Sequence, residues 1–246
     1  MSDFRKELLR TDIVPRKLNK VSKQHKMLFL RDLKKNFIKT EAVTICQCGS
    51  EKLEQLTKID RFGLPFGSLI CQKCGLITTS PRIKEESLPY YYDKYYHPLN
   101  YGKESLKDQK TLYAEGQGKK IFNILKYYLP KKNKIRVLEI GAGTGNVLEE
   151  FKRQASLIDI EVNELGTEYS NDCIEKCNEI GLNVIFGNLQ TIAEKKIKFD
   201  VIILSHVFEH FVNLGEEIKH VKKLMFKNSL LYIEVPGVLS IHKRPY

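Results

Sequence analysis

The chain has 246 residues, of which 42% are hydrophobic and 29% charged, which excludes a collagen-like, low-complexity or largely disordered protein. No apolar run approaches the roughly 18 residues of a membrane-spanning helix. The N-terminal MSDFRKELLR lacks the apolar stretch of a secretion signal. We therefore expect a cytoplasmic protein whose six cysteines are thiols or metal ligands.

The net charge of +11 is concentrated at the N-terminus. Residues 1–40 hold 12 Lys and Arg against 4 Asp and Glu, which accounts for +8 of the total. Such a basic arm can bind phosphates, nucleic acid or an anionic membrane, and a solvated tail is the simpler interpretation. Four apolar residues give the arm a weak amphipathic pattern: Leu28, Leu30, Leu33 and Phe37.

Residues 41–83 predict a small zinc-binding module built on four cysteines. The pattern is Cys46-x-Cys48, followed after 22 residues by Cys71-x-x-Cys74. Two thiolate pairs suit tetrahedral Zn²⁺, whose sulfur ligands lie at about 2.3 Å. Four thiolates leave no position for water, so the expected metal is structural. Two pairs of reduced surface thiols are the alternative.

Residues 84–110 read as a tyrosine-rich linker, with YYYDKYY at 90–96. Tyrosines offer flat apolar faces with hydroxyl tips. They would either form a lid over a pocket or pack between two domains.

From residue 111 onward, strand patterns alternate with helix patterns, which indicates βαβ units and a doubly wound, mostly parallel α/β sheet. Cys173 and Cys177 lie one turn apart on one predicted helix, and we expect them to be buried thiols. Strands are predicted at 135–140, 162–168, 183–186, 199–204 and 230–235, and helices at 111–128, 146–155, 171–180 and 214–226.

The segment RVLEIGAGTGNVL runs from a strand into a helix through Gly141, Gly143 and Gly145. A dinucleotide fingerprint would need glycine where Asn146 stands, so a pyrophosphate site is disfavoured. The tight turn lets a ligand lie against bare backbone. Glu139 adds a carboxylate, which repels phosphate and attracts ammonium or sulfonium groups. A glycine turn made only for packing is the alternative.

The next two strands end in polar residues suited to an adenosine. Glu168 ends the second strand and can accept both ribose hydroxyls, whereas its rival Asp159 lies inside an apolar run. After the third strand, the amide oxygen of Asn188 can accept from an adenine amino group, and the backbone N–H of Leu189 can donate to the ring. These groups meet at one sheet edge, where open α/β sheets bind ligands.

The chain resembles a class I S-adenosylmethionine-dependent methyltransferase in VLEIGAGTGN, GTEYS, GNLQTI, FDVIILSHVFEH and LLYIEVPG. The resemblance implies a Rossmann-like methyltransferase domain over residues 111–246. It would place the three glycines under the methionine part of the cofactor, Glu139 at its ammonium side, Glu168 at the ribose, and Asn188 with Leu189 at the adenine. The preceding CQCGS…CQKCGLITTSPR and the tyrosine-rich stretch resemble the zinc-bearing N-terminal module of a subgroup linked to sugar-nucleotide and surface-polysaccharide biosynthesis. This implies a sugar nucleotide or a related precursor as acceptor.

The same resemblance places the acceptor beside the segment 205–210, SHVFEH. A histidine has an ordinary pKa of about 6.5, so His210 would take a proton from the acceptor, and Glu209 would orient it. Ser205 and His206 would contact the cofactor. A purely structural role for His210 is the alternative.

Two other functions stay open at this point. The zinc module and the basic arm suggest a nucleic-acid methyltransferase, although LSHV lacks the Asn/Asp-Pro-Pro-aromatic motif of enzymes that methylate base amino groups. A non-catalytic relative would bind the cofactor only. The resemblance also implies seven strands, whereas Tyr246 lies only 11 residues after the end of the predicted fifth strand. We therefore expect a truncated chain, and a partner that covers the edge of the fifth strand is the alternative.

Overall fold

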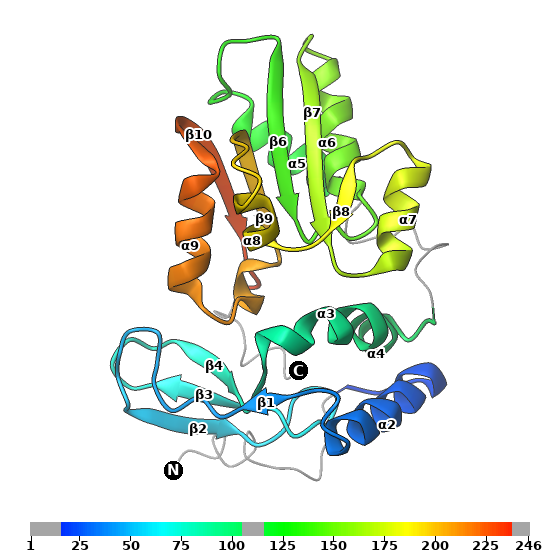
Figure 1. Cartoon of the computed structure of the whole chain (residues 1–246), viewed down its shortest axis with the longest axis vertical. Coiled ribbons are helices and arrows are strands. Elements are labelled where there is room, and N and C mark those ends of the chain that lie inside the picture. Colours follow the sequence, from blue (N-terminus) through cyan, green and yellow to red (C-terminus); the bar gives the residue numbers. More distant parts are fainter. Residues whose placement is uncertain (1–15, 105–115, 238–246) are drawn as a thin grey trace. The chain divides into compact units, whose positions relative to one another are not determined.

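The computed structural model describes residues 16–104 and 116–237, which fall into two units (Figure 1). One unit contains residues 16–104 and the other residues 116–236. Each has a hydrophobic core of its own. Within the described ranges, no helix has both the length and the apolar character needed to cross a membrane.

The second unit is built on a five-stranded parallel sheet in the order β10-β9-β6-β7-β8. Figure 1 shows β6, β7 and β10 pointing the same way. The predicted parallel α/β sheet is therefore confirmed. Its strands are β6 (Lys134–Ile140), β7 (Glu161–Glu168), β8 (Val184–Phe186), β9 (Phe199–Ser205) and β10 (Met225–Glu234).

Helices cover both faces of this sheet because successive strand side chains point to opposite sides. Ile135 and Val137 of β6 join the core beneath the first three helices, and Leu138 and Ile140 join the core beneath the other two. The sheet is doubly wound, as predicted. The helices are α5 (Gln117–Leu125), α6 (Asn146–Ser156) and α7 (Asn171–Glu179) on one face, and α8 (Leu189–Ala193) and α9 (Leu214–Lys223) on the other.

Strand β10 begins five residues before its predicted start, and α9 ends correspondingly early. A register shift separates Met225 from Leu230 in the ladder with β9. Within that irregular stretch, the N–H of Phe226 donates to the hydroxyl of Ser229 at 2.7 Å. Because the bulge interrupts the regular pairing of strand residues, the sequence pattern did not predict the first part of β10. Residues 111–115 of the predicted first helix lie outside the described residues.

The first unit combines two small antiparallel sheets, β2-β3-β4 and β1-β5, with helical segments. Its elements are α2 (Lys20–Lys34), β1 (Thr40–Glu41), β2 (Leu53–Thr57), β3 (Gly67–Cys71), β4 (Ile77–Ser80), β5 (Arg82–Ile83), η1 (Glu85–Ser87), α3 (Leu88–Tyr91), the π-helix η2 (Tyr92–Tyr96) and α4 (His97–Tyr101).

The described part of the basic arm is not a solvated tail, because it contains α2. Asn19 caps this helix by accepting a hydrogen bond from the N–H of Ser22 at 2.9 Å. Phe29 is fully buried in the core of this unit. Phe37, predicted on the apolar face, is 63% exposed instead, because it follows the helix end. One apolar face suffices to fold a lysine-rich helix onto the unit.

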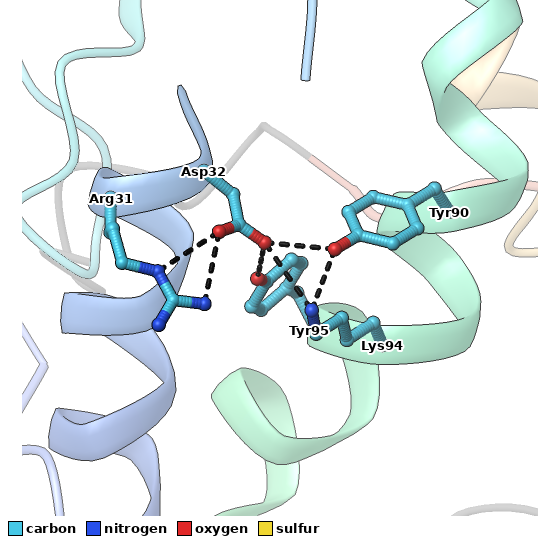
Figure 2. Close-up of polar contacts among 5 residues, drawn as sticks. All are labelled: Arg31, Asp32, Tyr90, Lys94 and Tyr95. Atoms are coloured by element: carbon cyan, nitrogen blue, oxygen red, sulfur yellow. Dashed lines mark hydrogen bonds and ion pairs between the residues drawn. The ribbon is translucent and has the colours of Figure 1, made fainter. Parts of the chain in front are cut away.

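A buried carboxylate fixes the tyrosine-rich stretch to α2. Asp32 accepts hydrogen bonds from the hydroxyls of Tyr95 and Tyr90, the latter at 2.8 Å (Figure 2). The side chains of Arg31 and Lys94 donate to it at 3.1 and 3.3 Å. The Tyr95 hydroxyl, against the effect of burial, holds the pKa of Asp32 well below its usual range. Tyr95 is itself fully buried, so it presents no free face to a ligand.

We expect Asp32→Asn to destabilise the first unit by about 3 kcal/mol, because four donors then face a group that has lost its charge. Folding lowers the carboxyl pKa, so the wild-type advantage is complete above about pH 4 and is lost as the pH falls through the folded-state value. Hydrogen exchange of α2 amides at pH 7 and pH 3 measures both effects. Tyr95→Phe removes one donor and should cost about 1 kcal/mol. Unchanged exchange in Asp32→Asn at pH 7 would contradict this assignment.

Candidate functional site

The glycine turn between β6 and α6 is left-handed at three positions, with φ of 68° at Gly141, 54° at Gly143 and 83° at Gly145. A Cβ at Gly141 would lie 2.6 Å from the side chain of Val207, and one at Gly145 would lie 2.5 Å from that of Leu182. At Gly143 it would meet nothing within 4 Å. Packing therefore explains the outer two glycines, and the middle one faces open space.

Glu168, at the end of β7, holds this turn from the side. Its Oε2 accepts the N–H of Gly143 at 2.9 Å, and its Oε1 accepts the N–H groups of Tyr169 and Ser170 at 2.8 and 3.1 Å. An ionised carboxylate offers about four acceptor positions, so roughly one is left for a ligand. The rival Asp159 precedes β7 and lies at the opposite sheet edge.

Glu139 lies next to Glu168 and is only 3% exposed. Its Oε2 has no hydrogen-bond partner among the described residues. Burial, and then the charge of Glu168, raise the pKa of Glu139 well above its usual value. A ligand that brings a donor or a positive charge would satisfy this oxygen, and a phosphate would not.

Asn188 is used differently from the sequence prediction. Its side-chain oxygen accepts hydrogen bonds from the backbone N–H and the hydroxyl of Thr191, at 3.0 and 3.1 Å, and so caps α8. The oxygen predicted as an adenine acceptor is thus engaged within the chain, and the amide NH₂ is the group left for a ligand. Leu189 begins α8, where the first N–H groups have no acceptor within the helix.

The predicted acceptor residues follow β9, which ends at Ser205. His206 has a φ of 55°, and its N–H donates to the carbonyl of Glu234 at 2.8 Å. Glu209 lies between two imidazoles, because its Oε1 is 3.8 Å from Nδ1 of His206 and 3.8 Å from Nε2 of His210. Burial raises the pKa of Glu209. The side chain of His210 is 39% exposed and can reach a ligand.

Cys177 contacts the glycine turn, a role that the sequence does not indicate. Its thiol donates to the carbonyl of Gly143 at 3.3 Å. Burial raises the pKa of Cys177 to about 12, which keeps the thiol protonated as a donor. Cys173 and Cys177 are both fully buried, as predicted. Their helical spacing predicted burial but carried no sign of a contact with the turn.

A polar cluster around Glu234 is a second feature of this region that no sequence motif predicts. Its carboxylate accepts hydrogen bonds from the side-chain amide of Gln117, from Lys120 at 2.8 Å and from the hydroxyl of Tyr232 at 2.7 Å. These bonds tie the start of α5 to the end of β10, beside the backbone of His206. Only the position of an acid at a strand end could have hinted at this contact.

The four predicted zinc ligands come together in the first unit, with all four sulfur atoms within 4.8 Å of one another. The sulfurs of Cys46 and Cys74 are 3.6 Å apart, and those of Cys48 and Cys71 are 3.7 Å apart. A tetrahedron with bonds of about 2.3 Å has edges of about 3.8 Å. The arrangement therefore fits one tetrahedral metal ion.

Two left-handed turns shape this cluster. The N–H of Gly49 donates to the carbonyl of Cys46 at 2.8 Å, and that of Gly75 to the carbonyl of Cys71 at 2.9 Å. Backbone N–H groups of Cys74 and Lys73 point at the Cys71 sulfur and lower its pKa to about 6. Burial and neighbouring thiols instead raise the pKa of Cys46 and Cys74.

Residues 113–245 match the profile of a methyltransferase domain family, which is more than half of the chain. The chain belongs to this methyltransferase family. The ubiquinone biosynthesis O-methyltransferase of Pelagibacter ubique (strain HTCC1062) is 31% identical over 115 residues, which are 46% of this chain and 47% of that protein. The chain thus spans about half the length of the curated relative that it matches.

Solved methyltransferase structures show a partial likeness to the chain. The plantazolicin methyltransferase BpumL, in complex with a pentazolic desmethylPZN analogue and SAH, is 21% identical with a TM-score of 0.46, covering 56% of this chain and 52% of that one. Coclaurine N-methyltransferase, bound to N-methylheliamine and SAH, is 18% identical with a TM-score of 0.42, covering 52% and 38%.

We expect Gly145→Ala to destabilise the second unit by about 3 kcal/mol, through the clash with Leu182 and the left-handed φ together. Gly143→Ala adds a methyl group in open space and should cost only about 1 kcal/mol, from φ alone. Hydrogen exchange of β6 amides at increasing urea measures both free energies of unfolding. Equal losses would show that the space before Gly143 is filled.

Proposed function

We propose that this chain binds S-adenosylmethionine at the carboxyl edge of the second unit's sheet and methylates a small-molecule acceptor. The observation that carries the proposal is the open space before Gly143, whose N–H is bound by the Glu168 carboxylate, together with the buried Glu139 that senses the charge of Glu168. Such a site repels a pyrophosphate and attracts a sulfonium and an ammonium group. Membership of the methyltransferase family supports the same function.

The residues around the turn fit such a donor, whose sulfonium supplies a transferable methyl group. The bare backbone of the three glycines would lie beneath its methionine part. The unpartnered oxygen of Glu139 would face the ammonium side, and the remaining acceptor position of Glu168 would take a ribose hydroxyl. The NH₂ of Asn188 and the N–H of Leu189 would face the adenine, and Ser205 and His206 would line the remaining side.

On the acceptor side we assign His210 as the general base. Its Nε2 would take the proton from an attacking hydroxyl as the new oxygen–carbon bond forms and the carbon–sulfur bond breaks, so that the donor would leave as the neutral thioether SAH. Glu209, 3.8 Å away, would support the resulting imidazolium. The main demand on the protein in such an in-line displacement is to align the acceptor and exclude water.

The proposed acceptor is a sugar nucleotide or a related surface-polysaccharide precursor. This choice rests on the resemblance of the cysteine module and the tyrosine-rich stretch to the subgroup linked to such pathways. A nucleic-acid acceptor is disfavoured, because the segment after β9 lacks the motif for base amino groups. The proposed division has a basic arm over 1–40, a zinc module over 41–83, a tyrosine-rich linker over 84–110 and a methyltransferase domain over 111–246. In the described residues, α2 of the arm and the tyrosine-rich stretch pack into one unit with the module.

We further propose that the four-cysteine cluster holds a structural Zn²⁺. Purified without chelators, the chain should contain about one zinc per molecule, measured by elemental analysis. Cys71→Ala should lose the metal and speed the hydrogen exchange of β3. Cys173→Ala, which removes a buried thiol outside the cluster, should keep it. Full zinc content in Cys71→Ala would refute the site.

Calorimetry with the demethylated product SAH tests the donor site. Glu168→Ala should lower the affinity for SAH at least about tenfold, because it removes both the proposed acceptor for a ribose hydroxyl and the acceptor of the Gly143 N–H. His210→Ala is the control and should keep SAH affinity within about twofold while abolishing transfer to a panel of nucleotide sugars. Unchanged affinity in Glu168→Ala would remove the ribose assignment. Equal loss of binding in both variants would make His210 structural.

A further inference from the structure

The sheet edge opposite the candidate donor site is strongly basic. Because β6, β9 and β10 are parallel neighbours, their amino ends lie together at this edge (Figure 1). Each strand begins at or just after a lysine-rich segment, PKKNKIR, EKKIK or KKLMFK. The exposed cations are Lys131, Lys132, Lys134 and Arg136, then Lys195, Lys196 and Lys198, and finally Lys222, Lys223 and Lys227.

A recess of about 340 Å³ opens within this edge. Arg136 and Asn163 are direct cross-strand partners in β6 and β7, so their side chains stand side by side on one face. The recess lies within the size range of small-molecule sites, about 300–1,000 Å³. Its lining residues are Lys132, Lys134, Arg136, Asn163, Asp200 and Phe226.

The charges in the recess are only partly compensated. Lys132 is 2.8 Å from the buried carboxylate of Asp200, and Lys134 is 2.6 Å from Glu161. The other oxygen of Asp200 accepts the backbone N–H of Arg136 at 2.8 Å. Within the described ranges, the Arg136 side chain has no carboxylate partner. Lys132 and Lys134 are thus paired with carboxylates, whereas the charge of Arg136 is not balanced by a carboxylate of the described residues.

One wall of the recess is a flat apolar ring. Phe226 is 43% exposed, and the ammonium of Lys198 lies 5.8 Å from its ring centre. The bulge at the start of β10 places this ring, since the Phe226 N–H is held by Ser229. A cation next to an exposed aromatic face suits a ligand that carries both an anion and a planar ring.

We propose that this recess is a second ligand site, which binds the diphosphate of a nucleotide-sized molecule. The guanidinium of Arg136 would bind phosphate oxygens in its two-pronged geometry, which a lysine cannot match. Asn163 would add an amide donor, and a base would lie against Phe226. The site is distinct from the candidate donor site, because it lies at the opposite end of the same strands. Its small concave form favours a compact diphosphate over an extended nucleic acid.

The test is calorimetry of the whole 246-residue chain, purified without chelators, with two probes, inorganic pyrophosphate and UDP, in excess SAH. Arg136→Ala should lower the affinity for both probes about tenfold. Phe226→Leu should lower the affinity for UDP alone, because only UDP has a base to lie against the ring. This result would distinguish a nucleotide site from a site for free diphosphate. Arg153→Ala, a surface arginine on α6 paired with Glu150, is the matched control and should change neither. Unaltered hydrogen exchange of β6 shows that the Arg136 variant is folded.

Three results would overturn the second site. Equal weakening by Arg136→Ala and Arg153→Ala would mean unspecific attraction to a basic protein. Loss of UDP binding in His210→Ala, with none in Arg136→Ala, would place the nucleotide in the acceptor site. Tight binding of a single-stranded RNA that Arg136→Ala leaves unchanged would make the edge a nucleic-acid surface. SAH affinity should be the same in all recess variants. The proposals of the recess site and of the donor site can therefore be refuted independently of each other.

Discussion

The candidate donor site depends on how closely the backbone between β6 and α6 approaches its neighbours. Gly141 packs against Val207 and Gly145 against Leu182, at distances that exclude any side chain. Between these two contacts, Gly143 is held on both sides, because its N–H is bound by Glu168 and its carbonyl by the thiol of Cys177. The open space is therefore formed before any ligand arrives, which lowers the ordering cost of binding.

A parallel sheet brings strand ends of one kind together, and this chain uses its two edges for opposite charges. Glu139, Glu168, Glu209 and Glu234 all lie at or just beyond the carboxyl ends of strands. Lysine-rich segments precede or open three of these strands, β6, β9 and β10, at the amino edge. Burial, and then the charge of Glu168, raise the pKa of Glu139. An anion is thus disfavoured at one edge and favoured at the other.

The strands of the second unit were predictable to within one or two residues, apart from the start of β10, because buried parallel strands are continuous apolar runs. The glycine turn and the strand-end acids follow from the same pattern. The bulge at Phe226 did not, since its hydrogen bond to Ser229 replaces the ladder. Other contacts could not be predicted, because the tertiary fold brings their partners together. Examples are the hydrogen bonds of Glu234 to Gln117 and Lys120, and the use of the Asn188 side chain to cap α8. In the first unit, lysines obscured the one apolar face of α2.

The first unit has short strands and a small core, so polar constraints carry much of its specificity. Asp32 binds Tyr90 and Tyr95 from a buried position, and this fixes the rotation of the helical turns that carry the other tyrosines. The rings of Tyr92 and Tyr96 are partly buried, and their centres lie 5.0 Å apart within the same π-helix. The carboxylate of Asp32 thus anchors the tyrosine-rich stretch to α2 and places Tyr95 in the core of the unit.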